Sequence, residues 1–245
     1  MSHKQQKDFI QGVSTNLKQY FDDSTVLEVG SLDINGSIRS FFNNCDYIGL
    51  DVASGKGVDV VCQGQEYSAD SNSFDHVISC EAMEHNPYWK ETFENMIRLC
   101  KKDGLVTFTC ATTGRREHGT SKKHPNSSPL TVDIGWDYYR NLDAGDFKKE
   151  FELDELFSHY HFWSNWSSFD IYFCGIKKGD AVVSIEGWDE MVKDIDRIVA
   201  IDNKTRLAIY RKAMAVTIGD KWFNLMRFTA KKLKLKKLSL IHGDW

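Results

Sequence analysis

Short runs of β-branched and other apolar residues recur along the first 110 positions of the chain, separated by turns and more polar stretches. Runs of this length and composition are typical of buried strands. The hydrophobic pattern therefore predicts five strands in this part of the sequence. They are TVLEV (25–29), DYIGLD (46–51), VDVVC (58–62), FDHVIS (74–79) and LVTFTC (105–110).

Apolar residues at helical spacing lie around and between these runs. Residues 5–21 and 87–100 each carry an apolar stripe, which predicts an N-terminal helix and a helix after the fourth strand. A further helix is expected over AGDFKKEFELDELF (144–157). Strands that alternate with helices favour βαβ units and a parallel, doubly wound sheet.

Two aromatic-rich runs follow, HYHFWSNW (159–166) and FDIYFCGIKK (169–178), and they predict an antiparallel hairpin. The expected fold class is α/β, with a Rossmann-like, doubly wound, seven-stranded sheet. This sheet is mostly parallel and ends in the antiparallel hairpin, and an N-terminal helix and a helical C-terminal extension complete the chain. We expect residues 1–180 to form the main domain and residues 181–245 to form the extension.

The extension ends in a basic segment. Residues 221–245 contain seven Lys or Arg and one Asp, a charge of about +6 in a chain whose net charge is −4. The simplest interpretation is a helix that packs on the domain and has a solvated basic end. The alternatives are a helix that forms a homodimer or docks a partner, and a basic contact with an anionic membrane or nucleic acid.

Bulk composition favours a cytoplasmic globular protein. A chain of 245 residues is long enough for one α/β domain and an appendage. No apolar run approaches the ~18 residues that a membrane span needs, and the first residues show no secretory signal. The six cysteines form no C-x-x-C pair, which favours buried free thiols in a reducing compartment.

The first candidate for chemistry is VLEVGSLDINGS (26–37), where a strand runs into a glycine turn and, as we expect, a helix. Gly30 lets a ligand approach the main chain, and a helix N-terminus attracts a carboxylate or phosphate. Asp51 ends the second strand, where a carboxylate can bind both hydroxyls of a ribose. A nicotinamide cofactor and a turn without a ligand are the alternatives, although Leu32 and Asn35 interrupt the G-x-G-x-x-G spacing.

Five segments between residues 22 and 115 follow one another as VLEVGS…NGS, YIGLD, SNSFDHVIS, EAMEH and MIRLCKKDGLVTFT. Their succession resembles the class I S-adenosylmethionine-dependent methyltransferases. The resemblance is to the type 11 group, which includes ubiquinone and menaquinone C-methyltransferases and many sugar and natural-product O-methyltransferases. It implies an enzyme that uses S-adenosylmethionine as its methyl donor.

The resemblance also implies which residues bind the cofactor. The turn after the first strand corresponds to the motif that holds the methionine end, and the acid that ends the second strand corresponds to the ribose ligand. Gln63 stands where the family often has an Asp beside the adenine, and its amide can still hydrogen-bond there. The expected cofactor-binding residues are Glu28, Gly30, Ser31, Asp51, Val52, Gln63, Gly64, Cys80 and Glu81.

The tripeptide Asn86-Pro87-Tyr88 is one residue short of the N-P-P-Y box with which amino-methyltransferases grip a planar nitrogen. In those enzymes the box follows the fourth strand directly, whereas here it comes six residues later. Asn is a favoured N-cap, and Pro is favoured at the first helical position. We therefore interpret Asn86-Pro87 as the start of a helix, with a nucleobase-gripping role as the alternative.

The long segment 110–142 leaves the fifth strand at the carboxyl edge of the sheet, where ligands bind in such folds. Methyl transfer needs an aligned acceptor and, for a hydroxyl, removal of a proton. His118 in this segment is the first candidate for that proton removal, and His85, after the fourth strand, is the second. The spacing of His118 and His124 matches no zinc pattern, so we expect no metal.

Three classes of function fit the sequence. We favour an S-adenosylmethionine-dependent methyltransferase that acts on a small molecule or glycan, with oxygen as the acceptor atom. The alternatives are a methyltransferase of RNA or another macromolecule, which the basic segment would hold, and a non-catalytic S-adenosylmethionine-binding module. The negative net charge argues against nucleic acid as a partner. A homodimer through the C-terminal helices is the protein assembly to test.

Overall fold

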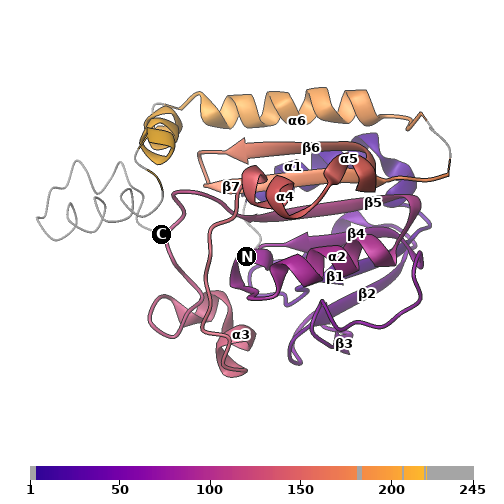
Figure 1. Ribbon diagram of the computed structural model, residues 1–245, viewed down its shortest axis with the longest axis horizontal. Helices are drawn as coiled ribbons and strands as arrows, with labels where there is room; N and C mark the ends of the chain where they lie inside the picture. Colours follow the sequence, from indigo (N-terminus) through magenta and orange to yellow (C-terminus); the bar gives the residue numbers. More distant parts are fainter. Residues whose placement is uncertain (1–3, 181–183, 206, 218, 220–245) are drawn as a thin grey trace, which may run out of the picture.

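The computed structural model describes residues 4–180, 184–205, 207–217 and 219 of the chain. Seven strands form one sheet in the order β3-β2-β1-β4-β5-β7-β6 (Figure 1). The strands β1 to β5 pair in parallel, and β7 pairs antiparallel with β5 and β6, as the sequence predicts. The strands are β1 (Thr25–Val29), β2 (Asp46–Asp51), β3 (Val60–Val61), β4 (Phe74–Cys80), β5 (Cys100–Ala111), β6 (Phe157–Asn165) and β7 (Asp170–Lys177).

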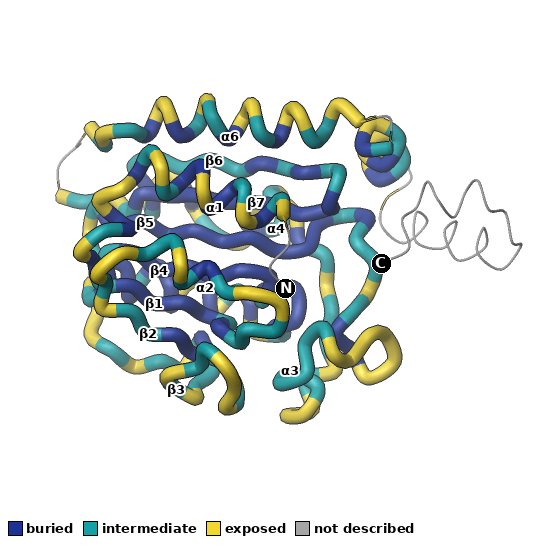
Figure 2. The backbone as a smooth tube through the Cα atoms, turned by 180° about the vertical axis from the view of Figure 1, so that it is seen from behind, coloured by how far each residue is buried: buried dark blue, intermediate teal, exposed yellow. Residues whose placement is uncertain are grey.

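Helices lie on both faces of this sheet, and the strands between them are the most deeply buried part of the chain (Figure 2). The short 3-10 helices are η1 (Lys18–Tyr20), η2 (Arg39–Phe41), η3 (Met83–His85) and η4 (Pro125–Ser127). The α-helices are α1 (Lys4–Asn16), α2 (Trp89–Leu99), α3 (Pro129–Asp133), α4 (Ala144–Glu150), α5 (Leu153–Leu156) and α6 (Trp188–Asn203).

Each face of the sheet has its own apolar core, because successive residues of a strand point to opposite sides. Val26 and Ile78 pack with residues of α1 and α6 on one face. Leu27 and Val77 pack with residues of α2 and α4 on the other. The continuous apolar runs of the sequence thus serve two cores at once, as expected for parallel strands that are covered on both sides.

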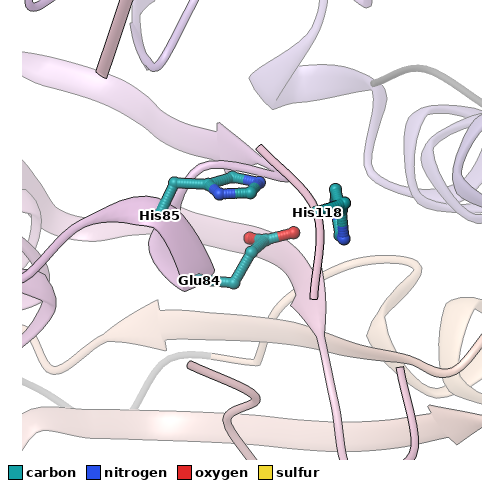
Figure 3. A group of neighbouring side chains, drawn as sticks. All are labelled: Glu84, His85 and His118. Atoms are coloured by element: carbon teal, nitrogen blue, oxygen red, sulfur yellow. The ribbon is translucent and has the colours of Figure 1, made fainter. Parts of the chain in front are cut away.

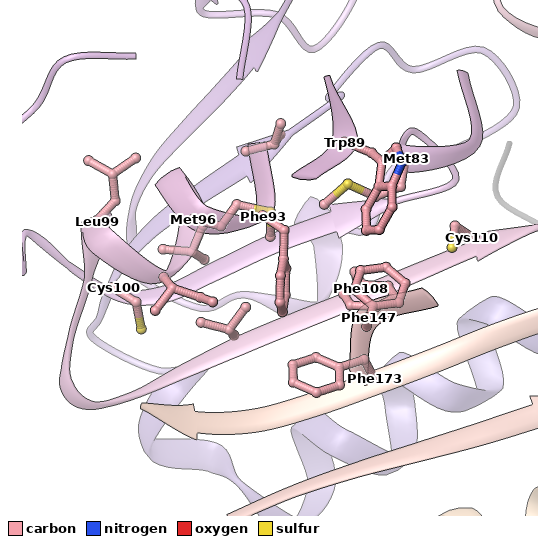
Figure 4. Close-up of a cluster of buried hydrophobic side chains, with 14 of the residues drawn as sticks. Met83, Trp89, Phe93, Met96, Leu99, Cys100, Phe108, Cys110, Phe147 and Phe173 are labelled. Atoms are coloured by element: carbon pink, nitrogen blue, oxygen red, sulfur yellow. The ribbon is translucent and has the colours of Figure 1, made fainter. Parts of the chain in front are cut away.

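Aromatic rings form the centre of the core beneath α2 (Figure 4). The ring centroid of Phe93 lies 5.6 Å from those of Phe108 and Phe173 and 5.3 Å from that of Phe147. All three contacts are edge-to-face, a favourable geometry for aromatic pairs. Since these rings come from α2, β5, β7 and α4, one cluster ties two helices to the middle of the sheet.

The helix expected after Gly30 is wrong, because the fully described stretch 31–45 contains only the 3-10 helix η2. The carboxylate of Asp33 accepts a hydrogen bond from the Gly36 N–H at 2.7 Å, and Gly36 has a φ of +114°. Asp and Gly together form a turn here that competes with helix formation. The anion site that we expected at a helix N-terminus is therefore wrong as well.

Other predicted elements differ only in their bounds. The strand expected over 58–62 is reduced to β3. The helix expected over 144–157 is divided into α4 and α5 by extended backbone at Phe151. The N-terminal helix is confirmed, although it ends at Asn16 and the 3-10 helix η1 follows it.

The C-terminal part of the described chain packs on the same face of the sheet as α1. The indole N–H of Trp163 in β6 donates a hydrogen bond to Asp196 of α6 at 2.9 Å. Further helical residues follow over 207–217. The division of the chain at residue 180 stays a prediction, and the basic segment 221–245 lies outside the described residues.

The aromatic cluster should dominate the stability of the domain. Phe93→Ala removes a fully buried ring, so we expect the free energy of unfolding to fall by about 3–5 kcal/mol in urea denaturation. Val61→Ala is the matched control, because this β3 side chain is 57% exposed and its loss should change stability by less than about 0.5 kcal/mol. Equal effects of the two substitutions would contradict this assignment of the core.

Candidate active site

The carboxyl ends of β1, β2 and β4 meet at one edge of the sheet, because these strands are parallel neighbours. Gly30 follows β1 with a φ of +83°, a conformation that other residues rarely adopt. A Cβ atom at Gly30 would lie 2.4 Å from the Cβ of Ala82, which follows β4. Glycine at this position therefore allows the turns after β1 and β4 to close against each other.

Glu28 lies near the end of β1 with only 5% of its surface exposed. The hydroxyl of Tyr47 donates a hydrogen bond to its carboxylate at 2.7 Å. Burial raises the pKa of Glu28 to about 7, against the opposing effect of the Tyr47 hydrogen bond. This carboxyl is therefore poised to change protonation when a charged group binds beside it.

Asp51 ends β2 beside the turn that follows β1. One carboxylate oxygen accepts the Leu32 N–H at 3.0 Å, and the other accepts the Val52 N–H at 2.8 Å. Burial raises the pKa of Asp51, and these two backbone hydrogen bonds oppose the rise. Each carboxylate oxygen can accept a further hydrogen bond, so the side chain is held in place and still able to bind hydroxyl groups.

Two adjoining pockets lie at this edge of the sheet. Both are lined by Gly30, Leu32, Ile34 and Cys80. The first pocket is also lined by Gln6, Glu28, Ser31, Gly36, Ser37 and Ile38. The second is also lined by Asp51, Glu81, Ala82, His85, Ser127, Ser128, Pro129, Leu130 and Thr131. The structure therefore brings six of the nine expected cofactor-binding residues together around the two pockets.

The other three expected residues, Val52, Gln63 and Gly64, are not among those that line these pockets. The side-chain oxygen of Gln63 accepts a hydrogen bond from the Gln65 amide at 2.7 Å. Gly64 packs so tightly that a Cβ there would lie 2.8 Å from Thr92. A role of these three residues in cofactor binding stays a prediction.

Two residues at the pockets carry unusual features. The hydroxyl of Ser31 is buried and has no hydrogen-bond partner within the described part of the chain. Glu81, directly after β4, is buried and has a φ of +55°, which is uncommon for a residue other than glycine. Unpaired buried polar atoms and strained backbone are both concentrated at binding sites in proteins.

The two histidines proposed for catalysis lie side by side (Figure 3). The ring of His118 meets the ring of His85 edge-on, with centroids 4.9 Å apart. Tyr139 covers both rings, at 4.9 Å from His118 and 5.5 Å from His85. Glu84, which sequence reasoning missed, completes a group whose ligand-type atoms all lie within 4.8 Å of one another.

All three side chains of this group favour their neutral forms. Burial lowers the pKa of His118 to about 4, although the Arg116 carbonyl opposes the shift. Burial, and then the neighbouring His118, lower the pKa of His85. Burial, and then the nearby Glu81 carboxylate, raise the pKa of Glu84. Both imidazoles are therefore neutral at pH 7, with lone pairs available.

The segment between β5 and α4 reaches back over the site, as the sequence predicts. Residues 127–131, which run from the end of η4 into α3, line the second pocket together with Gly30 and Leu32 of the turn after β1. Figure 1 shows α3 apart from the helices that cover the sheet. His124 lies on the exposed side of this segment. Arg115 is engaged elsewhere, in an ion pair with the buried Asp170 at 2.9 Å.

Asn86 serves the local fold. Its side-chain oxygen accepts the Tyr88 N–H at 2.8 Å, and its amide nitrogen donates to the Thr92 hydroxyl at 2.8 Å. The helix begins at Trp89, two residues later than predicted. The amide thus shapes the turn before the helix, but the prediction that Asn86 is the N-cap is wrong, because the N-cap is Tyr88 and no described side chain caps the helix.

Some pocket residues gave no signal in the sequence. Gln6 comes from α1, far from the motifs, and reaches the first pocket only through the packing of that helix on the sheet. Glu84 could have been noticed, because it precedes His85 at the end of a strand. Its relation to His118, however, depends on a loop that returns from the fifth strand, and no local pattern predicts that return.

None of the helices in the described residues is both long enough and apolar enough to cross a membrane. Residues 37–108 match the model of a protein family described as a methyltransferase domain. A comparison with curated proteins gave no match.

Solved structures with similar folds include several methyltransferases. One is phosphoethanolamine N-methyltransferase 2 of Haemonchus contortus, in complex with phosphomonomethylethanolamine and S-adenosylhomocysteine. It has 14% sequence identity with this chain and a TM-score of 0.49, and the alignment covers 72% of this chain and 58% of that one. The 1,6-didemethyltoxoflavin-N1-methyltransferase of Burkholderia thailandensis has 11% identity and a TM-score of 0.48, with 70% and 79% covered. This chain thus spans less than two thirds of the Haemonchus enzyme.

The matched residues include β2, β4 and most of β5, and with them Asp51, Cys80 and Glu81 at the carboxyl edge, whereas Gly30 and the rest of the turn after β1 lie before the match. The strand order places β1 between β2 and β4, so the glycine turn after β1 lies at the same edge of the sheet as these residues. Residues 37–108 therefore match a methyltransferase domain, and the sheet around them has the strand order that the sequence predicts for the S-adenosylmethionine-dependent class.

Proposed function

We propose that this enzyme methylates a hydroxyl oxygen of a small molecule or glycan. The observation that carries the proposal is the second pocket, which Asp51 lines from the end of β2 and His85 lines from η3, after β4. A cofactor bound on Asp51 and an acceptor beside His85 would share this space. The enclosing segment 127–131 limits the pocket to a compact group, which favours a small acceptor over a folded macromolecule.

The residues at the carboxyl edge of the sheet fit S-adenosylmethionine as the cofactor. Asp51 is held by two backbone N–H groups and can accept the two ribose hydroxyls. The buried Glu28 suits the ammonium of the methionine end, and the unpaired Ser31 hydroxyl in the same pocket suits a polar group beside it. Cys80 and Glu81 complete the wall between the two pockets.

When bound, S-adenosylmethionine supplies an activated methyl group: a C–O bond forms, the S–CH₃ bond breaks with its electron pair left on sulfur, and the hydroxyl proton leaves. The chain's own contribution is to hold the acceptor in line and to accept that proton. The neutral His118 and His85 are the groups that we assign to this task. His118 donates its Nδ1–H to the Arg116 carbonyl at 2.9 Å, which leaves the lone pair of Nε2 available.

Two other functions remain as alternatives. A methyltransferase of RNA or another macromolecule would use the basic segment 221–245, and a non-catalytic module would bind the cofactor only. The buried imidazole of His85 lines the pocket and packs against the partly buried His118, which favours catalysis over mere binding. A homodimer through the C-terminal helices stays a prediction.

Asp51→Ala should weaken the binding of S-adenosylhomocysteine by about 1–3 kcal/mol in calorimetry, because the ribose hydroxyls lose a charged hydrogen-bond partner. Asp46→Ala is the matched control, since Asp46 is an exposed acid at the opposite end of the same strand. Unchanged affinity of the Asp51 variant would remove this residue from the cofactor site. Tight binding of a nicotinamide dinucleotide in place of S-adenosylhomocysteine would overturn the cofactor assignment itself.

Cofactor binding should release a proton. The pKa of Glu28 is about 7 in the free protein, and an ammonium bound beside the carboxylate lowers it. At a pH just below 7 the carboxyl is partly protonated, so binding expels protons and affinity rises with pH through this range. Calorimetry in two buffers of different ionisation enthalpy measures the release, and Glu28→Gln should abolish it. Equal heats in both buffers with the wild type would contradict the role of Glu28.

A screen of labelled methyl transfer to sugars, phenols, carboxylates and RNA tests the acceptor class. We expect a hydroxyl compound as the acceptor, and His118→Ala should lower the rate by ~100-fold or more without a change in cofactor affinity. His124→Asn, on the exposed side of the same segment, should retain the rate. Transfer to RNA alone would replace the proposal by its macromolecular alternative, and full activity of His118→Ala would remove this histidine from the mechanism.

A further inference from the structure

The carboxylate of Glu84 is buried without a partner. Glu84 has 0% of its surface exposed, and neither of its carboxylate oxygens forms a hydrogen bond with any described residue. Arg115 attracts this carboxylate, but its guanidinium is already paired with Asp170. A buried carboxylate without hydrogen bonds is costly, and such a group calls for a cation or a proton.

Two neutral imidazoles face the same point. His85 is 3% exposed, and its Nδ1 atom is buried without a hydrogen-bond partner among the described residues. His118 uses Nδ1 for the Arg116 carbonyl at 2.9 Å, so its Nε2 atom carries a lone pair. A backbone carbonyl on one ring nitrogen is the usual way in which proteins orient a histidine that binds a metal through the other nitrogen.

The local fold holds these three side chains together. Glu84 and His85 are neighbours on η3, directly beyond the end of β4. Gly119 brings the returning loop against them, because a Cβ atom at this position would lie 2.5 Å from Cε1 of His85. One ligand-type atom from each of Glu84, His85 and His118 lies within 4.8 Å of the others, and Figure 3 shows the carboxylate between the two rings.

From this geometry we infer that Glu84, His85 and His118 bind one divalent transition-metal ion. Two imidazoles and one carboxylate suit Zn²⁺, Mn²⁺, Fe²⁺ or Co²⁺, whereas Mg²⁺ and Ca²⁺ prefer oxygen ligands alone. Three protein ligands leave coordination positions open, as in metal sites that act on a substrate. Such metal–ligand bonds are ~2.0–2.2 Å long, so the three atoms, which lie within 4.8 Å of one another, must move closer together when the ion binds.

The metal site adjoins the proposed acceptor space. His85 lines the second pocket together with Asp51 and Thr131, so an open coordination position on this side points to the acceptor. A hydroxyl oxygen bound there loses its proton more readily, because a bound cation lowers the pKa of oxygen ligands. In the metal-bound enzyme the two histidines are ligands, so the proton passes to water, and only in the metal-free enzyme do they accept it themselves. The activation of the hydroxyl by the metal rests on the proposed O-methylation and adds detail to it. The binding of the metal itself does not depend on that proposal.

Metal binding is tested on the full chain without any acceptor. The protein is stripped with a chelator, dialysed against Zn²⁺, Mn²⁺ or Co²⁺, and analysed for metal content by mass spectrometry. We expect one ion per wild-type chain for at least one metal, and with Co²⁺ we expect visible absorption bands from nitrogen and oxygen ligands. Glu84→Gln and His118→Ala should each lower the content at least tenfold, whereas His124→Asn should retain it.

Circular dichroism and S-adenosylhomocysteine binding show whether each variant is folded, and Glu84→Gln conserves the shape of the side chain. If the wild type retains no more metal than Glu84→Gln, the inference is overturned. Metal bound equally by the wild type and by both ligand variants would also overturn it, because the ion then sits elsewhere.

The acceptor screen separates this inference from the proposed function. Metal bound as expected, with no transfer to any hydroxyl compound, would leave the metal site standing and reject the O-methylation. Transfer to a hydroxyl compound by a chain that binds no metal would support the O-methylation and reject the metal site. Transfer that is lost on chelation and restored by the ion that the chain retains would support both.

Discussion

The parallel pairing of β1 with β2 on one side and β4 on the other is the constraint on which the rest of this structure depends. Leu27 is aligned with Ile48 of β2 and with Val77 of β4, so the three strands end at the same edge. The chain reverses direction of winding at β1, and in such sheets the crevice at this point binds the ligand. The turn at Gly30, the carboxylate of Asp51 and the helix η3 are all placed by that one alignment.

Burial gives this edge its chemical character. The carboxyls of Glu28, Asp51 and Glu84 and the imidazoles of His85 and His118 are largely withdrawn from water, and burial shifts the pKa of each in the direction of its neutral form. Such a site favours the binding of cations, because a cation stabilises the charged form of a nearby carboxylate. An ammonium would do so beside Glu28, and a metal ion would do so beside Glu84. The same withdrawal from water strengthens every electrostatic contact made to a bound substrate.

Much of the fold follows from short-range patterns. Runs such as TVLEV and FDHVIS are too apolar for a surface position, and the two aromatic runs, 159–166 and 169–178, pair as predicted. The helix after Gly30 failed because Asp33 and Gly36 form a side-chain turn, and hydrophobic spacing does not register this kind of competition. Part of the site could also be predicted from the sequence, because the carboxyl ends of parallel strands lie at the same edge of a sheet and Asp51 ends one of these strands.

The rest of the site depends on contacts between distant segments. The sequence placed His118 in a loop, and its partial burial results from Gly119 packing on His85, 34 positions earlier in the chain. Glu84 lies beside His118 only because that loop returns to η3. The expectation of no metal rested on the spacing of His118 and His124 alone and did not consider this group. A crystal structure of the protein with S-adenosylhomocysteine tests the account most directly. We expect the ribose on Asp51 and the sulfur facing the pocket that His85 lines; a nucleoside bound elsewhere, or a sulfur turned away from that pocket, would contradict it.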